Sequence, residues 1–179
     1  MSDSPVPVYV DTRKIFLQQA SIAGFVALER LGRFAETLAS DKGTVFVELH
    51  FATNDSGQQI ISGKLHAEVE VVCQRCLEPL GIVLEDDIKL ALLKDEAKIS
   101  SLDEGLDPWI CPDNKLELAS IVEEQLMLCM PIVSYHDTAD CRQKPGYSTE
   151  AGKAIENGRN GVTNPFAVLK TLKKDDGTH

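Results

Sequence analysis

Alternating hydrophobic and polar residues in the middle of the chain predict three long β-strands. In residues 44–53 the apolar side chains fall on odd positions, and the same spacing recurs in residues 62–73. In residues 81–93 the apolar positions are the even ones. A period of two is typical of a strand with one buried and one solvated face. Because the connections between the runs are short, the pattern favours an antiparallel meander.

The flanking segments have different patterns. A first helical turn is predicted over residues 12–19, with Asp11 or Thr12 as its cap, and residues 21–28 favour a short strand. Apolar residues spaced for one helical face predict a helix over 28–40. A second helix is predicted over 115–130, where the proline that follows stops it.

The chain divides into one folded domain and a polar tail. Residues 94–113 have no period and are interpreted as an acidic loop within a single α+β domain spanning 1–141. The polar composition of 142–163 predicts a flexible linker. Residues 164–174 then have the pattern of a short amphipathic helix. Its cap, first turn and apolar side would be Asn164, Pro165, Phe166, Leu169 and Leu172, and we expect this side to bind a partner.

The expected fold class is therefore α+β. It consists of an antiparallel β meander or partly closed sheet packed with helices, followed by a flexible C-terminal tail that ends in a short helix. A chain of 179 residues with 43% hydrophobic content can bury a core without disulfides. No secretory leader pattern and no apolar run of membrane-spanning length are present, and the five cysteines are an odd number. We expect a cytoplasmic protein with reduced thiols and no membrane partner.

The charge is strongly negative and unevenly distributed. The formal net charge is −10. Residues 85–124 contain twelve acidic residues and four lysines, which gives −8, whereas residues 142–179 contain four acidic and seven basic residues, which gives +3. A negative field repels phosphate backbones and attracts basic partners, so direct nucleic-acid binding by the folded part is disfavoured. The alternative is that the acidic residues only keep the protein soluble.

Cys73 and Cys76 form a Cys-x-x-Cys motif at the end of a predicted strand. A redox couple would need the first cysteine at a helix N-terminus, and Pro79 argues against a helix there. A turn between strands can instead supply half of a structural zinc site. His136 and Cys141 have ligand-like spacing and would complete a Cys₃His set. Free thiols that only pack remain the alternative.

No catalytic residues are predicted. The sequence contains no glycine-rich phosphate loop, nucleophile elbow or H-E-x-x-H motif. His50 and His66 lie on the polar faces of predicted strands and are interpreted as surface residues. Cys111 and Cys129 have no local partners and are assigned to the core.

Three stretches in order resemble the YceD family, the large ribosomal RNA subunit accumulation proteins of bacteria and chloroplasts. They are CQRCLEPL at 73–80, IVEEQLMLCMPIVSYHDTADC at 121–141 and NPFAVLKTLK at 164–173. Each stretch alone is a weak signal, and their order carries the resemblance, which extends from about residue 8 to 174. Some members of the family have cysteine where this chain has His136, and either residue can bind zinc.

The resemblance implies a non-enzymatic accessory role in synthesis, processing or stability of large-subunit (23S) ribosomal RNA. Together with the acidic charge, it leads to the hypothesis that the chain acts in ribosome biogenesis through a basic ribosomal protein or a pre-ribosomal ribonucleoprotein. Two other classes stay open. One is a zinc-dependent or thiol-redox enzyme that uses Cys73 and Cys76, and the other is an acidic scaffold whose cysteines only pack.

Overall fold

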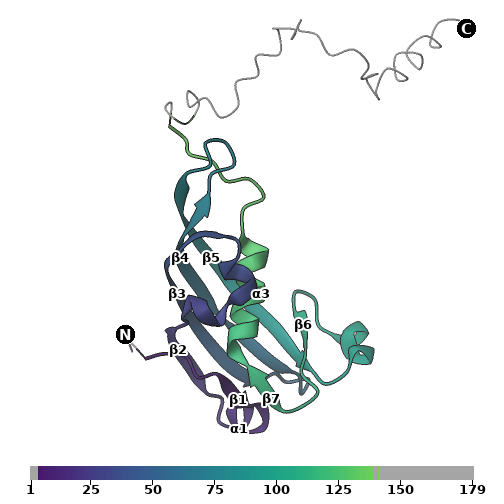
Figure 1. The fold of residues 1–179 in the computed structure, drawn as a ribbon. Coiled ribbons are helices and arrows are strands. Elements are labelled where there is room, and N and C mark those ends of the chain that lie inside the picture. The colour runs from purple at the N-terminus through teal and green to yellow at the C-terminus, as the bar shows by residue number, and fades with distance from the viewer. Residues whose placement is uncertain (1–3, 139–140, 142–179) are drawn as a thin grey trace, which may run out of the picture. The chain divides into compact units, whose positions relative to one another are not determined.

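Three long strands form the centre of the structure, as the alternating pattern predicts. In the computed structural model, which describes residues 4–138 and 141, they are β3 (Leu38–Thr53), β4 (Gln59–Val72) and β5 (Pro79–Leu93). β4 pairs antiparallel with both β3 and β5, so the predicted meander is confirmed (Figure 1).

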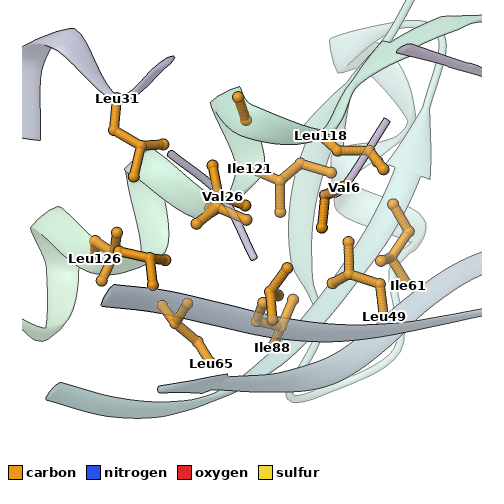
Figure 2. Packing of buried hydrophobic residues seen from close by; sticks show 14 of the residues in the cluster. Val6, Val26, Leu31, Leu49, Ile61, Leu65, Ile88, Leu118, Ile121 and Leu126 are labelled. Atoms are coloured by element: carbon orange, nitrogen blue, oxygen red, sulfur yellow. The ribbon is translucent and has the colours of Figure 1, made fainter. Parts of the chain in front are cut away.

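One face of this sheet is buried against helix α3 (Leu118–Cys129). Leu49, Ile61, Leu65 and Ile88 point from the strands into the core, where Figure 2 shows them beneath the apolar side of α3. The helix contributes Leu118, Ile121, Val122 and Leu126, each with 0% exposure. The sequence pattern therefore identified the correct face of each strand and of the helix, and the α+β class is confirmed.

The two edges of the sheet are short strands, and the sheet is open. β2 (Ser21–Phe25) pairs antiparallel with β3, and β6 (Asp107–Ile110) pairs parallel with β5. The prediction of an irregular loop over 94–113 was wrong, because this segment contains β6 and the 3₁₀ helix η2 (Glu96–Ser101). A strand of four residues is too short to display a period, and its proline is tolerated because it lies at an edge.

The N-terminal segment also uses a strand pair that helical periodicity concealed. β1 (Tyr9–Asp11) pairs with β7 (Lys115–Glu117), so the predicted helix over 115–130 begins only at residue 118. Helix α1 (Thr12–Leu17) follows β1. As predicted, Asp11 is its cap, and the carboxylate accepts a hydrogen bond from the Arg13 backbone N–H at 3.0 Å.

The prediction of a continuous helix over 28–40 was also wrong. The segment forms the 3₁₀ helix η1 (Leu28–Arg30) and the single turn α2 (Gly32–Ala35), and β3 already begins at Leu38. Leu28, Leu31 and Phe34 are buried, so the spacing correctly marked core residues. Pairing of Leu38 with Val71 in β4 takes over from helix propagation, because tertiary pairing outweighs a weak local propensity.

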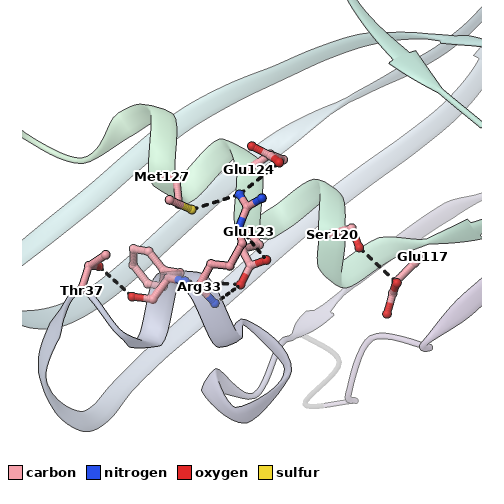
Figure 3. Close-up of polar contacts among 8 residues, drawn as sticks. Arg33, Thr37, Glu117, Ser120, Glu123, Glu124 and Met127 are labelled. Atoms are coloured by element: carbon pink, nitrogen blue, oxygen red, sulfur yellow. Dashed lines mark hydrogen bonds and ion pairs between the residues drawn. The ribbon is translucent and has the colours of Figure 1, made fainter.

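A carboxylate from α3 caps the short helix α2. Glu123 Oε1 accepts hydrogen bonds from the backbone N–H groups of Arg33 (2.8 Å) and Phe34 (3.3 Å). The Arg33 guanidinium in turn lies 3.0 Å from Glu124 Oε1 (Figure 3). Leu31, the residue at the N-cap position, has no side chain that can accept a hydrogen bond. Glu123 therefore satisfies N–H groups that α2 leaves without an intrahelical partner.

We predict that Glu123→Ala lowers the free energy of unfolding by about 0.5–2 kcal/mol, because it removes the acceptor of two backbone N–H groups. Glu124→Ala is the matched control. It removes an exposed ion pair and is expected to cost less than about 0.5 kcal/mol. Urea denaturation of both variants measures the difference, and equal losses would contradict the capping role.

The predicted linker over 142–163 and the predicted helix over 164–174 lie outside the described residues, as do residues 1–3 and 139–140 of the predicted domain. Among the helices within residues 4–138, none has both the length and the apolar character that a membrane span requires.

Candidate metal centre

The Cys-x-x-Cys motif occupies the loop between β4 and β5. The Leu77 backbone N–H donates to the Cys73 carbonyl, and the Cys73 N–H donates to the Glu78 carbonyl, both at 2.9 Å. Leu77 has a φ of 60°, in the left-handed backbone region that residues other than glycine and asparagine rarely adopt. The loop is therefore a tight turn without a helix, as predicted from Pro79.

The segment that follows α3 returns to this loop. The Gln74 backbone N–H donates to the Ser134 carbonyl at 2.9 Å, and the Gln74 side chain donates to the Ile132 carbonyl at 3.4 Å. In Figure 1 the chain after α3 runs toward the β4–β5 turn. These contacts place His136 beside the two cysteines, although about sixty residues separate them in the sequence.

The four predicted ligands form one cluster. Single ligand atoms of Cys73, Cys76, His136 and Cys141 all lie within 4.8 Å of one another. Cys73 Sγ is 3.7 Å from Cys141 Sγ, and Cys76 Sγ is 3.4 Å from His136 Nδ1. Cys73 and Cys141 are almost completely buried, whereas Cys76 and His136 are half-buried.

These separations match the edges of a tetrahedral zinc site. Zinc–sulfur bonds of about 2.3 Å and zinc–nitrogen bonds of about 2.0 Å place two sulfur ligands about 3.8 Å apart, and a sulfur and a nitrogen about 3.5 Å apart. His136 Nε2 lies 3.1 Å from the Pro79 carbonyl oxygen. With Nε2 as the donor, Nδ1 is left unprotonated and faces the sulfur atoms, which is the arrangement of a metal-binding histidine. The residues present therefore fit a metal ion of this class.

The surroundings of Cys73 favour the deprotonated form of its thiol. Burial of the sulfur raises the pKa of this thiol, because removal from water disfavours the negatively charged thiolate. Backbone hydrogen bonds from Cys76, Arg75 and His136 outweigh burial and lower the pKa of Cys73 from 9.0 to about 5. The loop thus stabilises a thiolate, the form that binds metals.

The pKa of Cys76 moves in the opposite direction. A backbone hydrogen bond from Glu78 lowers it, but burial and the nearby sulfur atoms of Cys73 and Cys141 together raise it above 9.0. Three sulfur atoms so close together cannot all carry negative charge without a compensating cation. A bound divalent ion would relieve this repulsion.

The lowered pKa of Cys73 predicts a pH dependence for the metal-free protein. A thiol whose folded pKa lies below its unfolded pKa stabilises the fold above the unfolded value, and this contribution is lost as pH falls through the folded value. Between pH 8 and pH 5.5, chelator-treated wild type should therefore lose more stability than Cys73→Ser. The pKa of Cys76 is raised, so its contribution to stability depends on pH in the opposite direction. That contribution is lost as pH rises above 9, outside this window. Urea unfolding at both pH values provides the measurement, and an equal pH dependence in the two proteins would refute the prediction.

Sequence reasoning missed three residues around the cluster. Pro79 supplies a carbonyl, Arg75 reaches Cys141, and Tyr135 stacks on Arg75. Their positions beside the motif residues were the only signal, because backbone acceptors and stacking leave no spacing pattern.

The other residues singled out from the sequence lie outside the cluster. Cys111 is in the core, Cys129 packs against it, and His50 and His66 contact glutamates on the exposed side of the sheet.

The fold and this cluster define a class: a small α+β protein with an open meander sheet and a Cys₃His candidate metal centre at one strand connection. A sequence model of the family described as "Large ribosomal RNA subunit accumulation protein YceD" matches residues 61–173, a span that includes all four clustered residues. The chain therefore belongs to the YceD family, as the motifs predicted.

One relative is similar along almost its whole length. The chain is 26% identical over 175 residues to the large ribosomal RNA subunit accumulation protein YceD of Haemophilus influenzae, and the match covers 97% of this chain and 99% of the relative. No solved structure matches the chain.

Proposed function

We propose that this chain is a non-enzymatic, cytoplasmic factor for the accumulation of large-subunit (23S) ribosomal RNA. Membership of the YceD family over residues 61–173 carries the proposal. The near full-length similarity to the protein of that name in Haemophilus influenzae supports it. The acidic charge supports action in ribosome biogenesis through a basic ribosomal protein or ribonucleoprotein.

The acidic segment 85–124 contributes to this proposal through its exposed strand positions. Glu85 and Asp87 are exposed positions of β5 between the buried Leu84 and Ile88. His66 of β4 contacts both Glu68 and Glu85. Glu123 and Glu124 of the same segment are instead engaged with Arg33. We therefore infer that the solvent-exposed face of the sheet, rather than helix α3, attracts a basic partner. The apolar side of 164–174 stays a second predicted contact.

Affinity purification of the full chain from bacterial lysate, with and without ribonuclease, tests whether the chain acts through a protein partner and not by binding RNA directly. A basic large-subunit protein should be retained after ribonuclease treatment, and its capture should weaken as salt screens the charges. Charge reversal at Glu85 and Asp87 should reduce this capture, whereas reversal at the exposed Glu29 and Glu36 serves as the control. Ribosomal RNA that stays bound after every protein partner is removed would show direct RNA binding and contradict action through a protein partner.

We also propose that Cys73, Cys76, His136 and Cys141 hold a structural zinc ion. A closed Cys₃His set leaves no open position for a substrate. The hydrophobic core cluster does not include these residues, so the ion would order the two loops rather than the core. The lowered pKa of Cys73 also suits a thiol-redox enzyme, but this sulfur has 0% exposure and lies in a turn without a helix.

Elemental analysis of the full chain purified without chelator should find zinc in about a one-to-one ratio. Cys73→Ser/Cys76→Ser should abolish binding and accelerate hydrogen exchange in residues 73–78 and 131–136, while the central strands stay protected. Cys111→Ser, in a buried cysteine outside the cluster, is the control. If the wild type contains no zinc and the double substitution leaves hydrogen exchange unchanged, the zinc site is refuted. The cysteines would then be packing residues only.

A further inference from the structure

Arg75 lies between the two cysteines of the motif, and its side chain turns toward the other half of the cluster. Its Nη1 atom is 3.8 Å from Cys141 Sγ and 3.5 Å from the carbonyl oxygen of His136. The guanidinium carbon lies 4.5 Å from the centre of the Tyr135 ring. Arg75 therefore links the β4–β5 loop to the returning segment through its side chain.

The position of this cation matters because of the charge of the cluster. Three thiolates and one divalent ion together carry a net charge of −1, and Cys73 and Cys141 are almost completely buried. Negative charge removed from water needs a nearby compensating group. The guanidinium of Arg75 is a positive group beside Cys141 Sγ and can supply that compensation.

We propose that Arg75 is a positioning residue of the metal centre, which holds Cys141 in place and balances the charge of its thiolate. This inference depends on the zinc part of the proposed function. Cys141 is five positions beyond His136, and its sulfur must approach Cys73 to complete the cluster. The contacts of Arg75 with the His136 carbonyl and the Cys141 sulfur connect both of these residues to the loop.

Tyr135 explains why the cation is arginine rather than lysine. A planar guanidinium stacks on an aromatic face and still directs its N–H groups outward in the plane. The Tyr135 ring thereby orients Arg75 toward Cys141. A lysine would keep the positive charge but would lose the stacking and the fixed direction of its donors.

The first test is zinc affinity, measured on the full chain by competition with a chromophoric chelator. Arg75→Gln should weaken zinc binding about 10- to 100-fold, as for other groups that contact metal ligands. Arg75→Lys should give a smaller loss. Arg33→Gln, in an arginine that pairs with Glu123 and Glu124, should leave affinity unchanged. The cobalt-substituted protein should keep its tetrahedral absorption bands in Arg75→Gln, because all four ligands remain.

The second test is the reactivity of Cys141 in the zinc-loaded protein. Because zinc keeps Cys141 a thiolate in both wild type and Arg75→Gln, loss of the N–H donor of Arg75 should make this sulfur more nucleophilic. The rate of alkylation by iodoacetamide should therefore increase at Cys141 more than at Cys73, with the modified site identified by mass spectrometry. Tyr135→Phe keeps the ring and should behave as wild type, whereas Tyr135→Ala should resemble a milder Arg75→Gln. This second pair of variants carries the test if Arg75→Gln does not fold.

The outcomes separate this inference from the proposed function. A wild type that binds no zinc overturns both the zinc site and the role of Arg75. Tight zinc binding by wild type, with unchanged affinity and unchanged Cys141 alkylation in Arg75→Gln, overturns the role of Arg75 alone. If Arg75→Gln does not fold, equal affinity in Tyr135→Ala and Tyr135→Phe has the same meaning.

Discussion

The register between β4 and β5 is the constraint on which the rest of the structure depends. Pairing runs without interruption from Gln59 opposite Leu92 to Val72 opposite Pro79. Because side chains alternate between the two faces of a sheet, a shift by one residue would move the whole apolar set to solvent. The same register sets where the strands separate, and so places Cys73 and Cys76 together at the turn.

Alternation over long strands made the central fold predictable from the sequence. Val45, Val47 and Leu49 could be assigned to the core because each strand buries only one face. The pattern failed where elements are short, as in β6, or where pairing overrode helical spacing, as at Leu38. Side-chain caps such as Glu123 on α2 were beyond reach, because they join residues about ninety positions apart.

The candidate metal centre was predictable in composition but not in its surroundings. Residue type and spacing selected Cys73, Cys76, His136 and Cys141, and the structure brings one ligand atom of each together. The sequence contained no sign that Gln74 would bind the Ser134 backbone or that the Pro79 carbonyl would orient His136. Backbone groups are the same in every residue, so only the folded chain reveals which of them meet.

Both edges of the sheet are partly protected against strand addition. Along β2, Phe25 exchanges backbone hydrogen bonds with Ser4 and Val6, so the N-terminal residues occupy part of that edge. β6 is only four residues long and contains Pro108, which has no N–H to donate. Edges of this kind resist the side-by-side pairing that leads to aggregation. An unfolded chain would therefore find little free backbone at either edge through which to extend the five-stranded sheet.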